Sequence, residues 1–376
     1  MAAIPTEQTA LIGMEDGSLG LSQYVKVPEL EDDMILVRNM AVALNPIDVK
    51  MVGKLATPGA VAGMDFAGEV VSIGSKVQTS VPIQIGDRVC GAVPGMHALT
   101  PNVGAFAQYV GVSDVVTMKI PNHLTFEAGA SLGSGIGTIG QALFQSLQVP
   151  GTPDKPCKKP VQVLVYGGST ATGTLAIQLL KLSGLDPIAT CSPHNFDLVK
   201  SYGASAVFDY HACPASDSSD STDHADTPEA AIKRHTRGSL RYVLDCISEP
   251  DTMQFCYRCL GRAGGRYTAL EPFPAFLAET RKHTVAAGWV LGPTLLGKPL
   301  GWPEPFARAG NPKDREFARW WFAIAQKLLD EGVLRVHPLR IVNERGGDGF
   351  AAVEEGLAIL RKKQVSGRKL ICRIQY

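Results

Sequence analysis

The stretch that decides the fold is Val161-Gln-Val-Leu-Val-Tyr-Gly-Gly-Ser-Thr-Ala-Thr-Gly173. An apolar strand runs into a turn of glycine, serine and threonine, and the apolar residues that follow have helical spacing. A strand that enters a helix through such a turn opens the βαβ unit of dinucleotide-binding domains. Two glycines of the usual pattern are missing, so the turn alone is a weak signal.

Beyond this turn the chain alternates between helices and strands. We expect helices over 174–182 and 196–202, and strands over 187–191, 206–210, 241–247 and 265–270. Such alternation predicts a doubly wound parallel sheet, the Rossmann arrangement, which we assign to residues 156–289. The segment 212–226 is rich in serine and aspartate and has no periodicity, so we expect an exposed insertion.

The region before the turn has a different pattern of apolar and glycine residues. Short apolar segments punctuated by glycine predict a β-barrel-like domain over residues 1–155. They are 34–38, 68–74, 86–91 and 104–110. Residues 125–147 have helical periodicity, and 151–160 are rich in proline and lysine, as in a linker. A helix and a strand after residue 348 would return to this domain, so we assign 290–376 to it and predict an α/β fold with a β-barrel.

Composition excludes several classes of partner. Thirty-six basic and 36 acidic residues leave no net charge, which does not favour nucleic acid or an anionic membrane. No apolar run approaches the length of a membrane span, and we expect a cytoplasmic protein. The eight cysteines are scattered, as is typical of reduced thiols. We predict that Cys256 and Cys259 lie on a helix and serve packing rather than zinc binding or redox chemistry.

The turn can still hold a phosphate. Gly167 and Gly168 can make the bend, and Gly173 allows close packing of helix on strand. The four residues between them, Ser169-Thr170-Ala171-Thr172, are small and carry hydroxyls at a helix N-terminus, where backbone N–H groups favour an anion. The alternative is an ordinary connection between a strand and a helix.

The end of the second strand selects the cofactor. An acidic residue there would bind a ribose 2′-hydroxyl and repel a 2′-phosphate, but the sequence has Ser192-Pro193-His194-Asn195 instead. Tyr210, after the next strand, can stack or donate a hydrogen bond. We therefore predict NADPH rather than NADH, with these five residues as contacts.

Other segments resemble the medium-chain dehydrogenase/reductase superfamily over essentially the whole chain. The resemblance lies in Asn45-Pro-Ile-Asp48, Gly63-Met-Asp-Phe-Ala-Gly-Glu-Val70, Gly86-Asp-Arg-Val89 and Gly104-Ala-Phe-Ala-Gln-Tyr109. It implies a GroES-like catalytic domain beside a Rossmann domain. The cysteine and the Gly-His-Glu of the zinc alcohol dehydrogenases are absent here, so no metal is expected, and reduction of a conjugated double bond is favoured over alcohol oxidation.

A narrower resemblance is to enoyl reductases that act in trans on fungal highly reducing polyketide synthases. It rests on residues 166–172, 188–198, 261–265 and 289–294. It implies NADPH-dependent reduction of an α,β-unsaturated acyl thioester carried by a partner synthase, with or without a peptide synthetase module. The acyl-carrier domain would be a transient partner. Two alternatives stay open: a free-standing quinone or enal reductase, and a non-catalytic NADPH-binding protein.

The resemblance also implies site residues. Lys50, after the turn that begins at Asn45, and Thr138 are the candidate catalytic residues. We expect the cofactor to contact Ile47, Asp48, Val49, Lys50, Leu260, Gly261, Val365 and Ser366, and the substrate to contact Gly135, Ile136, Gly137, Thr138, Phe273, Trp289 and Leu291. Each has a structural alternative: most lysines are solvated, Ser-Gly is an ordinary turn, and the apolar residues can simply fill a core.

Pro293 bears on assembly. Many members of the superfamily dimerise through an edge strand from this region, and a proline removes a hydrogen-bond donor from such an edge. We therefore expect a monomer.

Overall fold

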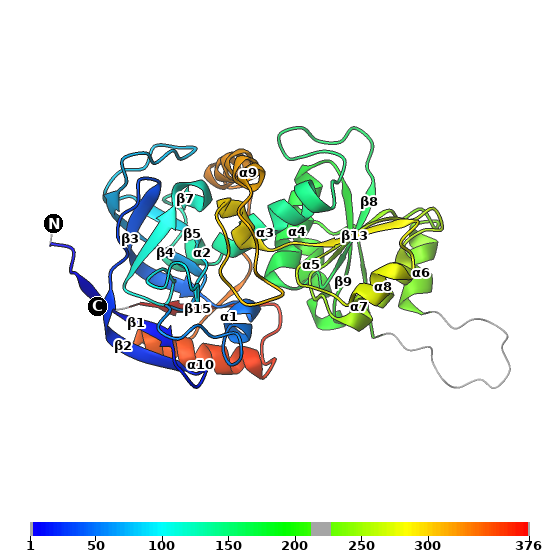
Figure 1. Ribbon diagram of the computed structural model, residues 1–376. Coiled ribbons are helices and arrows are strands. Elements are labelled where there is room, and N and C mark those ends of the chain that lie inside the picture. The colour runs from blue at the N-terminus through cyan, green and yellow to red at the C-terminus, as the bar shows by residue number, and fades with distance from the viewer. Residues whose placement is uncertain (1–2, 212–226, 375–376) are drawn as a thin grey trace. The chain divides into compact units, whose positions relative to one another are not determined.

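The computed structural model describes residues 3–211 and 227–374, so the predicted insertion at 212–226 lies outside the described residues. The chain divides into two compact units, coloured from blue to red along the sequence in Figure 1. Unit 1 comprises Met1–Gly137 and Gly292–Tyr376, and unit 2 is Thr138–Leu291. The first division falls before the predicted boundary at residue 155 because the π-helix η2 (Gln141–Ser146) packs on the sheet of unit 2.

Unit 2 contains a six-stranded parallel sheet in the order β10-β9-β8-β11-β12-β13. Its strands are β8 (Gln162–Tyr166), β9 (Asp186–Thr190), β10 (Ala206–Phe208), β11 (Tyr242–Asp245), β12 (Gly265–Ala269) and β13 (Val285–Trp289). The order reverses between β8 and β11, so the chain winds outward in both directions from there. Because crossovers between parallel strands are right-handed, α4 (Ala171–Leu182) and α7 (Pro250–Cys259), on either side of the reversal, are expected to cover opposite faces of the sheet. The predicted doubly wound arrangement is confirmed.

The core of unit 2 explains the paired cysteines. Cys256 and Cys259 on α7 are fully buried in a cluster with Val243, Met253 and Tyr267. Their packing role follows from this burial. Shorter helices complete the unit: α5 (Phe196–Ser201), α6 (Pro228–His235) and α8 (Ala275–Glu279).

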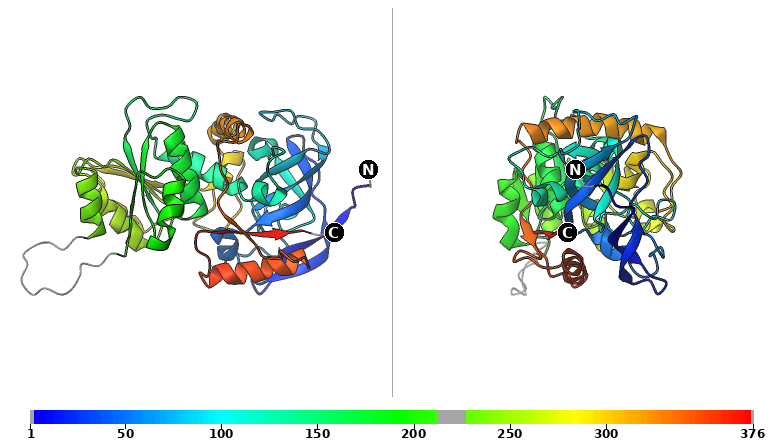
Figure 2. Two further views of the ribbon diagram at one scale, coloured as in Figure 1. Left: turned by 180° about the vertical axis from the view of Figure 1, so that it is seen from behind. Right: turned by 90° about the vertical axis from the view of Figure 1, so that its left-hand side faces the viewer.

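Unit 1 is built on a β-sheet with the order β14-β15-β3-β4-β5-β7, on which β6 also pairs with β3. The strands are β3 (Met34–Ala43), β4 (Asp65–Ile73), β5 (Arg88–Ala92), β6 (Tyr109–Ser113), β7 (Thr117–Lys119), β14 (Leu339–Ile341) and β15 (Lys369–Arg373), with β1 (Glu7–Gly13) and β2 (Leu19–Lys26) as a separate pair. The predicted C-terminal return is confirmed, because β15 pairs antiparallel with β3. Helix α10 (Gly349–Arg361) lies beside β15 (Figure 2).

Two elements of unit 1 differ from expectation. Residues 104–108 form no strand, and β6 begins only at Tyr109. The helix α9 (Pro312–Asp330) was not predicted, although Asn311 caps it and Trp321 is fully buried on its inner face. In the described parts of the chain, no helix has both the length and the apolar character needed to cross a membrane.

The ground for the monomer prediction does not hold. Pro293 lies in the short helix η4 (Gly292–Leu296), whereas the edge strand of the sheet is β13, which ends at Trp289. The proline therefore removes no donor from that edge. The monomeric state remains a prediction without this argument.

Candidate functional site

The turn between β8 and α4 requires its glycines. Gly167 has φ +80°, and a Cβ on Gly173 would lie 2.3 Å from the Gly167 carbonyl oxygen. A Cβ on Gly168 would lie 2.7 Å from the Cβ of Ala189 on the neighbouring strand. The bend and the close packing predicted from the sequence are thus made by these three residues.

Thr170 organises the start of α4. Its hydroxyl accepts a hydrogen bond from the Gly173 N–H at 2.9 Å and donates one to the Gly167 carbonyl at 2.8 Å. The N–H groups of Ala171 and Thr172 lie in the first turn, where no helix carbonyl precedes them to accept a bond. The turn therefore combines a fixed backbone with the positive end of a twelve-residue helix.

The ends of β9 and β10 bring the other predicted nucleotide contacts together. The Ser192 hydroxyl lies 3.0 Å from the Tyr210 hydroxyl, and the Asn195 amide nitrogen lies 3.2 Å from His194 Nε2. Pro193 begins the short helix η3 (Pro193–Asn195), which holds these side chains at the carboxyl edge of the sheet. The cluster offers hydroxyl, amide and imidazole groups.

Sequence reasoning missed one carboxylate near this cluster. Asp209 directly follows β10, and together with burial it raises the pKa of the Cys191 thiol to about 11, burial being the larger cause. The Asp209 carboxylate accepts a hydrogen bond from the His211 N–H at 2.9 Å. It belongs to the third strand of the sheet rather than to the tip of the second, so the prediction that looked only at the second tip overlooked it.

The end of β11 borders the same turn across the point where the strand order reverses. Asp245 is fully buried and accepts hydrogen bonds from the Thr252 and Tyr267 hydroxyls at 2.6 and 2.9 Å. Cys246 follows it, and burial raises the pKa of its thiol to about 12 despite hydrogen bonds with Thr172 and Thr170. Open parallel sheets bind ligands at such a reversal, outside the carboxyl ends of the strands.

Three of the predicted substrate contacts lie near the ends of β12 and β13 and are partly buried. Trp289 ends β13 and Phe273 follows β12, and both pack partly buried against the core cluster of unit 2. The Phe273 and Tyr267 rings meet edge to face, with 5.8 Å between centroids. Leu291 is half-buried at the last position of unit 2.

Leu260 and Gly261 do not join this group. They end α7 and precede β12, and the Gly261 N–H donates to the Leu240 carbonyl at 2.9 Å, ahead of β11. They thus lie at the amino edge of the sheet, opposite the turn. The prediction that they line the cofactor site is corrected, because a chain that leaves a helix of a parallel sheet re-enters at the amino edge.

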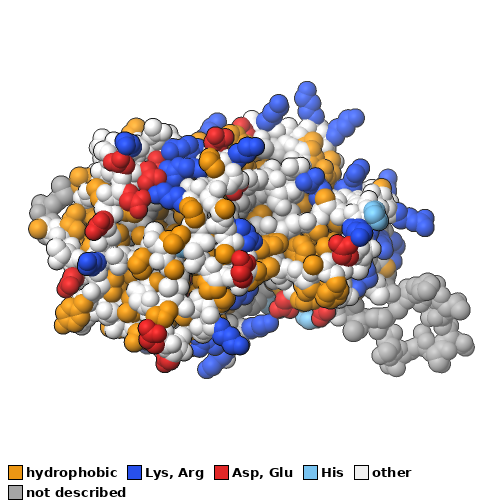
Figure 3. Space-filling view, in the orientation of Figure 1, with side chains coloured by type: hydrophobic (Ala, Val, Ile, Leu, Met, Phe, Trp, Pro, Cys, Tyr) orange, Lys and Arg blue, Asp and Glu red, His pale blue; other side chains and the backbone are white. Residues whose placement is uncertain are grey.

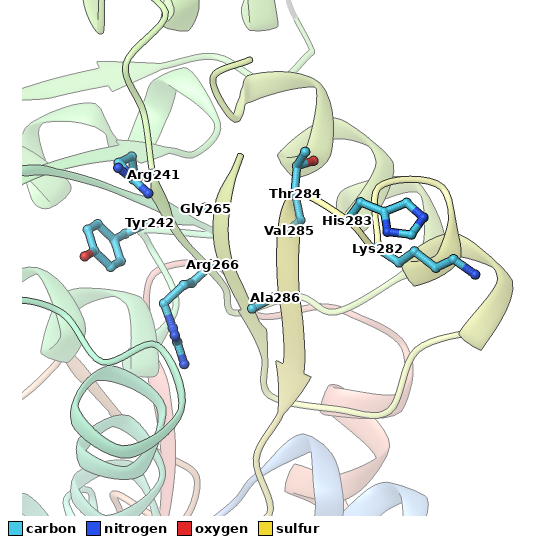
Figure 4. A pocket seen from close by; sticks show the side chains of 9 residues that line it. All are labelled: Arg241, Tyr242, Gly265, Arg266, Lys282, His283, Thr284, Val285 and Ala286. Atoms are coloured by element: carbon cyan, nitrogen blue, oxygen red, sulfur yellow. The ribbon is translucent and has the colours of Figure 1, made fainter. Parts of the chain in front are cut away.

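A cavity of about 460 Å³ also lies at this amino edge (Figure 4). Basic residues line it, among them Arg241, Arg266 and Lys282, and Figure 3 shows Lys and Arg side chains gathered over unit 2. In Figure 4, Lys282 and His283 point away from Arg241 and Arg266. The cations do not converge on one ligand position, and the cavity is remote from the turn between β8 and α4, which lies at the carboxyl edge of the sheet.

In unit 1, the short helix α1 (Pro46–Lys50) carries the candidate lysine. Lys50 is exposed at its end, with Ile47 and Val49 half-buried before it. Asp48 is buried, and desolvation raises the pKa of its carboxyl to about 7, with a further contribution from Asp65. Asp48 Oδ2 accepts the Asn45 N–H at 2.7 Å, while its buried Oδ1 has no hydrogen-bond partner among the described residues.

A polar cluster made of the half-buried Asn45 and the buried Asp65 and Lys369 contacts the start of this helix. Asn45 donates from its side-chain amide to Asp65 Oδ2 at 2.9 Å, and Lys369 Nζ donates to Asn45 Oδ1 and, at 3.4 Å, to Asp65 Oδ2. Asp65 Oδ1 accepts the N–H of Ser134, at the start of α3 (Gly133–Gly140), at 2.6 Å. Sequence reasoning missed Lys369, and no local pattern marks it.

The remaining predicted residues lie on α3 and in the C-terminal loop. Ile136 is fully buried and its carbonyl accepts the Trp321 indole N–H at 2.8 Å, so its side chain belongs to the core. Gly137 ends unit 1's share of α3, Thr138 begins unit 2, and both Gly135 and Thr138 are half-buried. Val365 is half-buried and Ser366 exposed, three to four residues before Lys369.

Metal ligation is not apparent in this arrangement. Within residues 3–211 and 227–374, no group of three or more His, Cys, Asp or Glu side chains is placed to hold a metal ion.

Comparison with known proteins identifies the family to which this chain belongs. The model of the alcohol dehydrogenase GroES-like domain matches residues 31–122, and that of the zinc-binding dehydrogenase matches 171–269. Among solved structures, a putative zinc-dependent alcohol dehydrogenase from Rhizobium etli superposes with a TM-score of 0.76 at 23% identity, covering 99% of each chain. A quinone oxidoreductase from Coxiella burnetii gives 0.68 at 24%, covering 98% of this chain and 100% of that one. At these identities the likeness shows the fold.

Curated sequences are much closer. The trans-enoyl reductase FSL5 of Gibberella zeae is 62% identical over 374 residues, which is 100% of this chain and 99% of the relative. A trans-enoyl reductase of Gibberella fujikuroi is 49% identical over 98% of both chains, and eqxC of Fusarium heterosporum is 48% identical over 98% and 99%. The chain therefore belongs to the fungal trans-enoyl reductases of the medium-chain dehydrogenase/reductase superfamily.

Proposed function

We propose that this trans-enoyl reductase uses NADPH to reduce the α,β-unsaturated acyl thioester that a partner polyketide synthase carries on its acyl-carrier domain. One observation carries the cofactor part of the proposal. The glycine and threonine turn lies where the strand order of unit 2 reverses, and the neighbouring tip of β9 has no acidic side chain.

The residues present fit a phosphorylated dinucleotide. The close approach at Gly173 leaves no room for a Cβ, so the backbone itself forms the cradle, and the first-turn amides of α4 are available for a pyrophosphate. Ser192, His194 and Tyr210 offer hydrogen bonds to a 2′-phosphate without a carboxylate on the same strand tip. Asp209, after the next strand, lies near Cys191 and is the group that could oppose this choice.

A bound nicotinamide supplies the hydride for the β-carbon of the substrate. The chain's own residues must stabilise the negative charge that then develops on the thioester oxygen. We assign this to the Lys50 ammonium, which is exposed at the end of a helix whose first turn is held by partly buried hydrogen bonds. The Thr138 hydroxyl is a second donor for the thioester carbonyl, and water is the proposed source of the α-proton.

Reconstitution with the partner synthase tests the activity. With this protein and NADPH, the product should be saturated at the reduced position, and without the protein it should keep the double bond. Lys50→Ala should keep NADPH binding and lose reduction. Faster turnover of carrier-free quinones or enals than of any acyl thioester would support a free-standing reductase instead. Absence of turnover on every acceptor would indicate a non-catalytic binding protein.

Titration of the two cofactors tests the specificity. We expect tighter binding of NADPH than of NADH, and equal or tighter binding of NADH would refute the assignment. Sedimentation at micromolar concentration tests the proposed monomer, and a stable dimer would contradict it. The encounter with the carrier domain is proposed to be transient.

A further inference from the structure

We propose that Lys369 is a positioning residue for the reaction: it fixes the helix that carries Lys50 by holding the Asn45 side chain from the buried side. The inference rests on the proposed role of Lys50. Lys369 itself is buried, and its ammonium donates hydrogen bonds to the Asn45 and Asp65 side chains.

The backbone around Lys369 provides a rigid base. Its own N–H donates to the Pro338 carbonyl at 2.8 Å, and the next residue, Leu370, accepts the Leu44 N–H at 3.0 Å. Strand β15 is paired on both sides, with β14 and with β3. The ammonium therefore projects from a fixed strand into the interior of unit 1.

The ammonium determines how Asn45 is oriented. An asparagine side chain has one acceptor and one donor end, and a lysine can only donate. Because Lys369 occupies Oδ1, the amide nitrogen of Asn45 faces Asp65, where it donates at 2.9 Å. The backbone N–H of Asn45 donates to the Asp48 side chain, and the Asn45 side chain faces the Asp48 backbone N–H in a capping box, so the orientation of this side chain affects the first turn of α1.

Asp65 extends the same cluster to α3. Its two oxygens are shared between the Lys369 and Asn45 side chains on one side and the Ser134 N–H on the other. Gly133 permits this approach, since a Cβ there would lie 2.8 Å from Asp65 Oδ1. One lysine is thus connected to two of the segments of unit 1 that carry predicted site residues, and it follows the third, the loop with Val365 and Ser366, by three residues.

The other titratable groups facing Lys369 do not replace it. His337 is buried beside it, and desolvation together with the charges of Lys369 and Arg368 lowers the pKa of its imidazole to about 4. Cys90 is fully buried, and burial with the charge of Asp65 raises the pKa of its thiol to about 12. Both are neutral near pH 7. Asp48 also interacts with this pair: desolvation raises the pKa of its carboxyl to about 7, Asp65 raises it further, and the charge of Lys369 opposes the rise. Lys369 is the cation that contacts Asp65.

Removal of the ammonium should loosen the turn without dismantling the unit. In Lys369→Met, Asp65 keeps the Asn45 amide and the Ser134 N–H as donors, whereas Asn45 Oδ1 loses its charged donor and keeps only the capping contact with the first turn of α1. Lys369→Arg preserves a buried donor and is the conservative rescue. Lys362→Met is the matched control, because Lys362 is an exposed lysine at the end of α10 in the same unit.

Hydrogen exchange of the protein without cofactor gives the first readout. We expect the amides of residues 47–51 to exchange roughly tenfold faster in Lys369→Met than in wild type or in Lys362→Met. The amides of β3 and β4 should keep their protection. Lys369→Arg should restore slow exchange in the turn.

Steady-state kinetics on an enoyl thioester gives the second readout. We expect kcat to fall about tenfold to a hundredfold in Lys369→Met with KM nearly unchanged, because misplacing a transition-state donor affects the chemical step. If this variant does not fold, Lys369→Met with Asp65→Asn removes both buried charges and takes its place. Unchanged exchange at 47–51 with unchanged kcat would overturn the proposal, as would protection lost equally throughout unit 1 with kcat per folded molecule retained.

The two proposals fail differently. A wild-type protein that reduces no thioester would refute the function proposed above, whereas the exchange measurement would still decide whether Lys369 holds the turn.

Discussion

Replacing Thr170 by alanine removes the hydroxyl that closes the turn between β8 and α4, where we propose that the cofactor phosphates bind. The Gly173 N–H then loses its acceptor and the Gly167 carbonyl loses a donor, although the backbone bond from the Thr170 N–H to that carbonyl remains. Loss of a helix N-cap costs about 1 kcal/mol of stability. For a chain of this size we expect the melting temperature to fall by roughly 2–4 °C.

Thr170→Ala should weaken cofactor binding more than an equal loss of stability elsewhere in unit 2 would. The turn must be ordered to present its amides, and a frayed turn pays the ordering cost when the ligand binds. If that cost is about 1 kcal/mol, affinity for NADPH falls roughly fivefold. Thr170→Ser keeps the hydroxyl and should bind as wild type does.

Thr227→Ala is the matched control. Thr227 caps α6 in the same unit by accepting the Ala230 N–H at 3.2 Å, so its loss removes the same kind of bond. Thermal unfolding and calorimetric titration with NADPH would be measured for both variants. Similar melting temperatures with weaker binding only in Thr170→Ala are expected. Equal NADPH affinity in the two variants would refute the reasoning that the turn holds the cofactor.

Three further changes test other parts of the site. Gly173→Ala brings a Cβ to 2.3 Å from a backbone oxygen of the turn. This overpacking costs about 1–3 kcal/mol and should outweigh the gain of up to about 1 kcal/mol from alanine in a helix. The free energy of unfolding, measured with denaturant, should therefore fall. Ser192→Asp adds a carboxylate at the tip of β9, so NADPH affinity should fall about tenfold or more while NADH is affected less, as parallel titrations would show. Asp48 has a pKa of about 7 in the folded chain against about 4 unfolded, so its contribution favours the folded state below about pH 4 and is lost as the pH rises to 7. Relative to Asp48→Asn, the free energy of unfolding of wild type should therefore decline over that interval and stay level above it, in unfolding curves taken from pH 4 to 8.

The local pattern of the sequence was sufficient for most of unit 2. Periodicity predicted β8, β9, β10, β11 and β12, because each strand is a short apolar run bounded by glycine or polar turns. Helix α4 begins three residues before the predicted start, at Ala171, since the Thr170 hydroxyl caps it there. Helix α9 could have been found as well: Asn311 and Pro312 are start signals, and Trp321, Ala325 and Leu328 repeat at helical spacing.

Contacts between distant segments could not be predicted in this way. Lys369 and Asn45 are separated by 324 residues, and neither lies in a pattern that identifies the other. Asp209 was overlooked for a related reason, because its proximity to Cys191 depends on the pairing of β10 with β9. Predicting such neighbours requires the order and register of the strands.

One error was avoidable from the sequence itself. In a parallel sheet, every segment that leads from a strand into a helix lies at the carboxyl edge, and every segment that leads from a helix into a strand lies at the amino edge. Ser169, Ser192 and Phe273 follow strands, which places them at the carboxyl edge, whereas Leu260 and Gly261 precede β12. The same rule identifies Cys246, after β11, as a neighbour of the turn between β8 and α4, because β11 pairs with β8 and the ends of the two strands are level. The direction of the chain at each turn therefore separates candidate cofactor contacts from residues that cannot reach the same edge.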